Sequence, residues 1–177
     1  FPIKYVAKDP SMIKFRPLGF EKEVVASDVP ETHPKGKAYA SLTKSWEKYP
    51  FFIDSAENVM CMLPFTNSHD TGKVDVDTKN VFIECTGTDL QNVETALHIL
   101  VTTLADMGGK IYSLEIEYNK KKIVTPNLTP KRKKFDLQYI NRRLGLSLSE
   151  EEAKALLEKM GFGYEEGNVL IPAYRAD

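Results

Sequence analysis

The chain has 177 residues and a mass of 20.0 kDa, enough to bury a core in one medium-sized domain or in one domain with a small appendage. Its 24 basic and 25 acidic residues give a net charge of −1, so no overall attraction to nucleic acid or to an anionic membrane follows. The apolar runs are short and no signal-peptide pattern opens the chain, which predicts a cytoplasmic protein without a membrane segment. The two cysteines, Cys61 and Cys85, lack metal-site spacing, so we expect reduced thiols. The start at Phe1 and the stop at Asp177 predict a piece of a longer polypeptide.

Two apolar segments, residues 51–53 and 59–63, flank a polar loop, and this pattern predicts a β-hairpin. If Asp54 pairs with Val59, Phe52 lies opposite Cys61 on one face. Pro64 ends the second strand. A polar, glycine-closed loop over residues 67–72 follows and carries many hydrogen-bonding groups.

Residues 80–86 form an apolar run interrupted by an acidic side chain and a hydroxyl, and the run predicts a β-strand. Because alternate residues of a strand share a face, Phe82, Glu84 and Thr86 would point the same way. A carboxylate is costly to bury without a partner. Two interpretations therefore remain open: an edge strand with Glu84 in solvent, or a polar pocket built into a sheet.

A helix is predicted after this strand. Thr88 and Gln91 have the spacing of a capping box, an apolar stripe follows, and Gly108 with Gly109 supplies the stop. Residues 112–118 then alternate between apolar and polar side chains, which predicts a half-exposed strand.

Residues 125–134 have the composition of a linker and predict a boundary. Beyond it, we expect a short helix that ends at Gly145 and a second helix that starts at a capping box of Ser149 and Glu152. Two strands, over residues 162–165 and 169–171, would follow. This order of helix, helix and hairpin is that of a small winged-helix-like unit, which we expect to be cut off at residue 177.

Common catalytic motifs are missing from the sequence. It contains no glycine-rich phosphate loop, zinc-type spacing or nucleophile elbow, so no metal site is expected. Cys61 with His69 is a poor nucleophile–base pair, because a thiol in an apolar strand stays protonated. The basic run of residues 131–134, with Arg142 and Arg143, is either a solvated linker or a contact for phosphates.

Three segments together, residues 63–68, 80–89 and 171–177, resemble the beta subunits of the archaeal and eukaryotic phenylalanyl-tRNA synthetase family in order and spacing. The resemblance covers nearly the whole chain. It implies an α+β fold, with a mixed or antiparallel sheet and packed helices in an editing domain over residues 1–125. A winged-helix-like domain, truncated at its C-terminus, would occupy residues 126–177.

The activity implied by this resemblance is hydrolysis of the ester of tyrosine wrongly attached to phenylalanine-specific tRNA. Glu84 matches the family's acidic receptor for the tyrosine hydroxyl, and Thr86 would offer a second hydroxyl. Phe52 and Cys61 match positions that line the pocket, where a smaller aliphatic side chain and a serine are common in the archaeal pattern. A site that hydrogen-bonds the hydroxyl can discriminate by on the order of 10⁴ to 10⁵.

Asn67 and Ser68 are the expected catalytic residues, because the resemblance places them by the scissile ester, where they would orient a water molecule or stabilise the oxyanion. The ribose hydroxyl of the tRNA is a further candidate to assist the water. Part of the family's pocket comes from an upstream segment with a glutamine and an arginine.

The family also implies partners and cofactors. The partners are phenylalanine-specific tRNA and an alpha subunit, in a tetramer of two alpha and two beta subunits. No cofactor is expected in this chain, since magnesium and ATP would act at another site, on the alpha subunit. A non-catalytic module for RNA binding or subunit docking is the alternative function.

Overall fold

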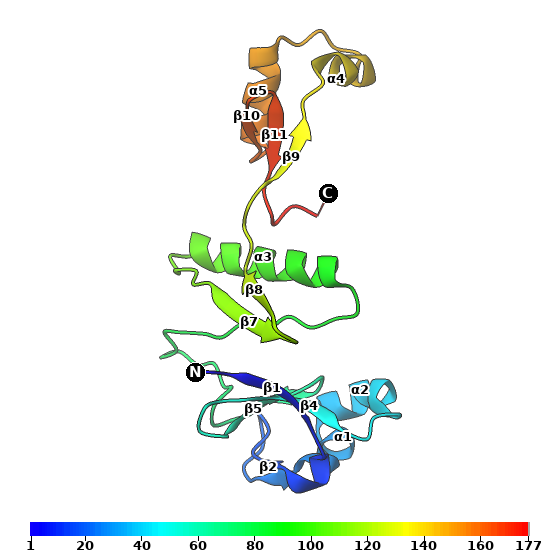
Figure 1. The fold of residues 1–177 in the computed structure, drawn as a ribbon, viewed down its shortest axis with the longest axis vertical. Helices are drawn as coiled ribbons and strands as arrows, with labels where there is room; N and C mark the ends of the chain where they lie inside the picture. The colour runs from blue at the N-terminus through cyan, green and yellow to red at the C-terminus, as the bar shows by residue number, and fades with distance from the viewer. Residues whose placement is uncertain (177) are drawn as a thin grey trace. The chain divides into compact units, whose positions relative to one another are not determined.

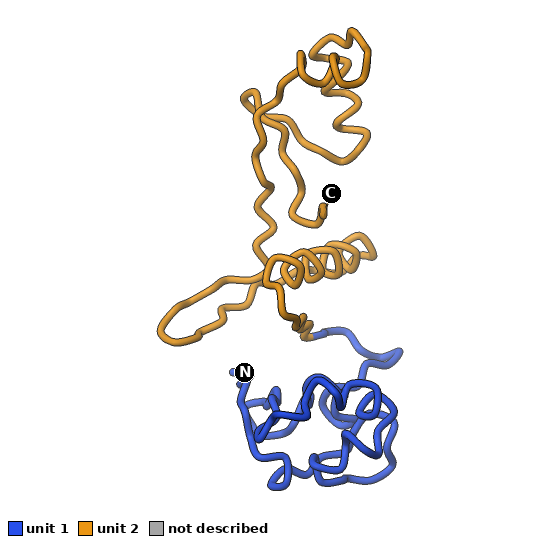
Figure 2. Tube along the Cα trace, turned by 90° about the vertical axis from the view of Figure 1, so that its right-hand side faces the viewer, with its two compact units in different colours: residues 1–81 blue, residues 82–177 orange. Residues whose placement is uncertain are grey.

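The chain folds into two compact units, residues 1–81 and 82–177, which Figure 2 distinguishes by colour. The structure is a computed structural model that describes residues 1–176. All strand pairs between these residues are antiparallel, and helices occur in both units. The predicted α+β class is therefore confirmed.

Unit 1 is built on a four-stranded sheet of order β1-β4-β5-β6. Figure 1 labels three of these strands, β1, β4 and β5. Its strands are β1 (Lys4–Lys8), β4 (Tyr49–Ile53), β5 (Val59–Met62) and β6 (Thr66–Asn67). Short elements complete the unit: η1 (Pro10–Met12), β2 (Lys14–Phe15), β3 (Val24–Val25), η2 (Ala26–Asp28), α1 (Val29–Thr32) and α2 (Pro34–Thr43).

One face of this sheet covers the hydrophobic core of unit 1. Phe51, Ile53 and Met62 are at most 2% exposed, and they pack with Phe15, Val29 and other apolar side chains. Successive side chains of a strand point to opposite faces, so residues one position away from these lie on the other face of the sheet. The local alternation in β4 and β5 thus separates a core face from an outer face.

The predicted hairpin is present, with one difference in register. Phe52 lies opposite Cys61 as expected, but Val59 pairs with Ile53 rather than with Asp54. A bulge between Phe52 and Ile53 accounts for the shift, because it adds one residue to a strand. Asp54 instead caps the loop, where its Oδ1 accepts hydrogen bonds from the backbone N–H groups of Ala56 and Asn58.

Unit 2 begins with α3 (Leu90–Asp106) and a hairpin of β7 (Leu114–Tyr118) and β8 (Lys121–Thr125). The helix starts one residue later than the predicted capping box, because the Asp89 side chain accepts a hydrogen bond from Asn92 N at 2.8 Å. An ionised carboxylate at this position also interacts favourably with the helix dipole. Strand β7 confirms a strand over residues 114–118, but four of its five residues are exposed, so the expected buried face is missing.

The predicted strand over residues 80–86 is wrong. These residues have no regular secondary structure and pair with no strand of the described chain. An extended segment becomes a β-strand only when its backbone groups bond to a neighbour, and alternation alone does not supply one. The side chains of Ile83, Glu84 and Cys85 are all half-buried, so the expected separation into two faces is also missing.

The winged-helix-like arrangement is confirmed. It contains α4 (Leu137–Leu144), α5 (Glu150–Lys159), and a sheet in which β11 (Asn168–Ile171) lies between β10 (Gly163–Glu165) and β9 (Lys131–Lys134). Helix α4 ends at Gly145 in the left-handed conformation, and α5 carries the predicted capping box. The basic end of the predicted linker is a strand, since β9 pairs along its full length with β11.

Candidate functional site

Four side chains form a row across the outer face of the sheet in unit 1. Tyr5 pairs with Phe52, Phe52 with Cys61, and Cys61 with Asn67. The neighbouring row, from Val6 through Phe51 and Met62 to Thr66, belongs to the core face. Directly opposed residues of antiparallel strands have their side chains on the same face, close enough to touch. Tyr5, Phe52, Cys61 and Asn67 are called the outer row below.

The two ends of the outer row differ in chemistry. Tyr5 and Phe52 form the aromatic end, with ring centroids 5.1 Å apart and planes tilted by 49°. Asn67 forms the polar end on β6, and Cys61 lies between them with 8% of its surface exposed. Three inter-strand spacings separate Tyr5 from Asn67, about 14 Å in all. The row therefore offers an apolar surface at one end and an amide at the other.

The polar end is held in place by the loop that follows β6. The Asn67 side-chain nitrogen donates a hydrogen bond to Gly72 O at 3.1 Å, and Ser68 N donates to Met60 O at 2.8 Å. A Cβ atom on Gly72 would lie 2.5 Å from Met60 O and 2.9 Å from Asn67 Cβ. Only glycine fits without movement of these groups, so the close approach of the loop fixes the Asn67 amide.

The second predicted catalytic residue, Ser68, lies in the interior of unit 1. It is 3% exposed, and its hydroxyl oxygen accepts a hydrogen bond from Asp70 N at 3.2 Å. Its backbone also bridges to Pro17. Asn67 is exposed on the outer face, whereas Ser68 holds the turn behind it.

Glu84 and Thr86 belong to unit 2, whereas Phe52, Cys61, Asn67 and Ser68 belong to unit 1. Thr86 is exposed. The Glu84 side chain is half-buried, and its Oε2 atom is buried with no hydrogen-bond partner among the described residues. Burial raises the pKa of the Glu84 carboxyl above its usual value. A hydroxyl that donated to this oxygen would remove an unfavourable feature of the folded chain.

The two cysteine thiols are poor nucleophiles in this structure. Burial, and secondarily the negative charge of Glu84, raise the pKa of the Cys85 thiol. Cys61 is buried in β5, so its sulfur atom is poorly accessible to a substrate. The surroundings of the two thiols agree with the expectation that water, and not a cysteine, attacks the ester.

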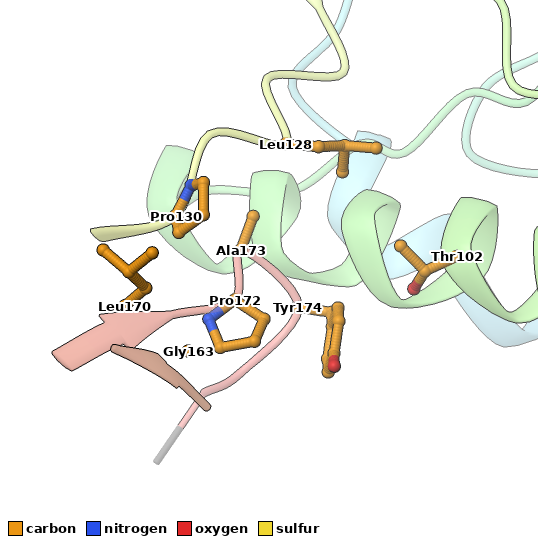
Figure 3. A pocket seen from close by; sticks show the side chains of 8 residues that line it. All are labelled: Thr102, Leu128, Pro130, Gly163, Leu170, Pro172, Ala173 and Tyr174. Carbon is orange, nitrogen blue, oxygen red and sulfur yellow. The ribbon is translucent and has the colours of Figure 1, made fainter. Parts of the chain in front are cut away.

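Unit 2 contains an apolar cavity of about 230 Å³ that none of the predicted site residues lines (Figure 3). Its wall includes Thr102 from α3 and Leu128, Leu170, Pro172 and Tyr174 from the C-terminal half of the chain. Nearby, His98 Nδ1 lies 3.3 Å from Ala173 O, which links α3 to the C-terminal segment. His98 is 8% exposed, and we interpret it as a structural residue.

Residues 1–176 contain no group of three or more histidine, cysteine, aspartate or glutamate side chains placed to hold a metal ion. None of the helices within them combines the length and the hydrophobicity that crossing a membrane requires.

The C-terminal part of the chain matches a known protein family. The family model of the tRNA synthetase B5 domain matches residues 133–177. This match covers α4, α5 and the strands β10 and β11. The C-terminal part of the chain is therefore similar to a domain found in tRNA synthetases.

The whole chain is similar to phenylalanine–tRNA ligase beta subunits. It is 46% identical over 180 residues to that of Pyrococcus abyssi, which covers 99% of the chain and 32% of the relative. The Archaeoglobus fulgidus protein is 43% identical over 181 residues, with 100% and 32% covered. The chain thus spans about a third of the length of the curated relatives it matches.

A solved structure agrees with this similarity. An N-terminal fragment of the phenylalanyl-tRNA synthetase beta subunit from Pyrococcus horikoshii matches with a TM-score of 0.90 and 40% identity, over 100% of this chain and 52% of that one. The chain is thus homologous to a part of the phenylalanine–tRNA ligase beta subunits, and the resemblance found in the sequence is confirmed.

Proposed function

We propose that this chain is the editing module of a phenylalanine–tRNA ligase beta subunit, which hydrolyses the ester of tyrosine mischarged on phenylalanine-specific tRNA. The observation that carries the proposal is the outer row, in which three residues expected at the pocket are direct cross-strand neighbours. They are Phe52, Cys61 and Asn67. Similarity to the beta subunits supports the family, and the row supports a binding face within it.

The geometry of the row suggests how the substrate lies. An aromatic side chain would rest on Phe52, and the ester would extend toward Asn67, where an amide can orient water or donate to the developing oxyanion. Water is the proposed nucleophile, because Cys61 is buried in β5 and burial raises the pKa of the Cys85 thiol. In this mechanism Ser68 acts by holding the turn that positions Asn67.

Selection of tyrosine over phenylalanine is assigned to Glu84. Its Oε2 atom is buried and has no partner in the described chain, so a tyrosine hydroxyl that donates to it satisfies an otherwise unpaired acceptor. A phenylalanine ring would leave that acceptor unpaired, and such sites discriminate by on the order of 10⁴ to 10⁵. Thr86, two residues further on, supplies a second hydroxyl to the substrate.

The partners and cofactors follow from the same proposal. Phenylalanine-specific tRNA carries the mischarged ester, and an alpha subunit completes a tetramer of two alpha and two beta subunits. Magnesium and ATP act in aminoacylation at a site on the alpha subunit, and the editing reaction uses neither.

Deacylation of tyrosyl-tRNA by the full-length protein tests the proposal. We expect the wild type to release tyrosine, and Asn67→Ala to lower kcat by about 10² or more, as for loss of an oxyanion-hole donor. The control is Asn92→Ala, which changes an exposed asparagine on α3 and should leave the rate unchanged. A wild type that does not hydrolyse tyrosyl-tRNA, or an Asn67→Ala variant as fast as the wild type, would contradict the mechanism.

One observation favours RNA binding as a second function. Strand β9 lies at the edge of its sheet, and Lys131, Lys133 and Lys134 are exposed and make no ion pair with a described residue. Arg132 differs, because it is held by Glu165 at 3.0 Å and by Glu166 at 3.4 Å. If the three lysines contact phosphates, replacing them with glutamine lowers RNA affinity and flattens its dependence on salt, whereas unchanged binding excludes that role.

A further inference from the structure

Tyr5 lies at the aromatic end of the outer row, and no sequence motif singled it out. It pairs with Phe52 although 47 positions separate the two residues in the chain. Val6, the next residue, packs against the core and pairs with Phe51. Alternation along β1 therefore directs Tyr5 to the face that carries Phe52, Cys61 and Asn67.

The Tyr5 ring is unusually accessible for a side chain that contacts another aromatic ring. Its surface is 61% exposed, whereas Phe52 is half-buried beneath the same face. The two rings are in contact at a centroid separation of 5.1 Å and a tilt of 49°. One ring is thus fixed by the sheet, and the other extends the apolar surface outward from it.

The position of Tyr5 in the row indicates which part of a substrate it meets. Asn67 occupies the opposite edge strand, about 14 Å away, where the proposed ester is attacked. The side chain of the aminoacyl group then points away from Asn67, toward Phe52 and Tyr5. Aromatic rings attract one another in tilted or offset geometries beyond the effect of buried area alone.

We propose that Tyr5 is a specificity-determining residue that binds the aromatic ring of the tyrosyl group together with Phe52. This inference rests on the proposed editing function and adds a residue to its substrate site. Within unit 1, Tyr5 and Phe52 would select an aromatic ring over a small side chain. A cross-strand aromatic pair that only stabilises the edge of the sheet is the competing explanation.

The test uses the full-length protein with deacylation of tyrosyl-tRNA as the assay. Two inhibitors that compete with tyrosyl-tRNA are added to this assay. Both are adenosine derivatives with an amino acid in a non-hydrolysable amide at the 3′ position, tyrosine in one and alanine in the other. We expect Tyr5→Ala to raise the inhibition constant of the tyrosyl derivative by about threefold to tenfold, the effect of one aromatic contact. Tyr5→Ala should leave the inhibition constant of the alanyl derivative unchanged, because the alanine side chain has no aromatic ring.

Two control variants separate binding from stability. Tyr5→Phe keeps the ring and should behave as the wild type, and Tyr39→Ala removes an exposed tyrosine of α2 and should change neither inhibition constant. Equal weakening of both derivatives by Tyr5→Ala, or no weakening of either, would overturn the role of Tyr5 while tyrosyl-tRNA hydrolysis persists. If the wild type fails to hydrolyse tyrosyl-tRNA, the editing function itself fails and this inference falls with it.

Discussion

Phe52 on β4 lies directly opposite Cys61 on β5, on the face of the sheet that turns away from the core of unit 1. The pair extends to Tyr5 on one side and to Asn67 on the other. Strand β1, from the start of the chain, and the consecutive strands β4, β5 and β6 thus present one continuous row. The strand register places these four residues on one face, and the loop closed at Gly72 holds the Asn67 amide.

The two neighbouring phenylalanines of β4 should respond differently to truncation. Phe51 is fully buried, so Phe51→Ala should reduce the free energy of unfolding by about 3–5 kcal/mol. Phe52→Ala should cost less than about 2 kcal/mol, because Phe52 is half-buried on the outer face, but it should raise KM for tyrosyl-tRNA. Urea unfolding and deacylation kinetics measure the two effects. A larger loss of stability for Phe52→Ala would contradict the assignment of faces.

Gly72→Ala should disturb the polar end of the row. The new Cβ would meet Met60 O at 2.5 Å, and since that atom is backbone, relief requires movement of the loop. We expect a loss of about 1–3 kcal/mol in the free energy of unfolding, together with slower deacylation as Asn67 moves. Ser55→Ala in the exposed hairpin loop is the control. A Gly72→Ala variant with wild-type stability and rate would show that the loop does not position Asn67.

The raised pKa of Glu84 makes a prediction about stability and pH. A carboxyl group whose pKa is higher in the folded than in the unfolded chain binds its proton more tightly when folded. This tighter proton binding contributes fully to the free energy of unfolding below the pKa of the carboxyl in the unfolded chain, about 4.3. The contribution is lost as pH rises through the pKa of the carboxyl in the folded chain. Glutamine does not titrate, so Glu84→Gln does not undergo this loss. The free energy of unfolding of the variant should therefore increase relative to that of the wild type as pH rises from about 4.

Urea unfolding of both proteins at several pH values, followed by a probe in unit 2, measures this difference. Glu158→Gln, which replaces an exposed side chain of α5, serves as the control. If the difference in the free energy of unfolding between Glu84→Gln and the wild type stays constant from pH 4 upward, burial does not destabilise the ionised form of Glu84.

Local patterns were sufficient for several parts of the fold. The polar loop at residues 54–58 predicted the hairpin and the pairing of Phe52 with Cys61, and the Ser149 capping box predicted the start of α5. In each case the signal lies within a few residues of the feature. Turn and cap residues act through neighbouring backbone groups, so their effect is visible in the sequence.

Features that depend on distant partners were not visible. Residues 80–86 alternate as a strand should, yet they have no strand to pair with in the described chain. The opposite error occurred at β9, where four consecutive cations indicated a linker although β11 pairs with all of them. Exposed edge strands tolerate lysine, so charge did not exclude a strand there. Tyr5 was missed for the same reason, because only the pairing of β1 with β4 gives it a place in the row.

The role of Glu84 is the central claim, and the ratio of kcat/KM for tyrosyl-tRNA to that for phenylalanyl-tRNA tests it most directly. We expect the full-length wild type to prefer tyrosyl-tRNA by on the order of 10⁴. Glu84→Ala should abolish most of this preference, while Glu94→Ala, at an exposed position of α3, should keep it. Equal ratios for the wild type and Glu84→Ala would contradict the claim that this carboxylate reads the tyrosine hydroxyl.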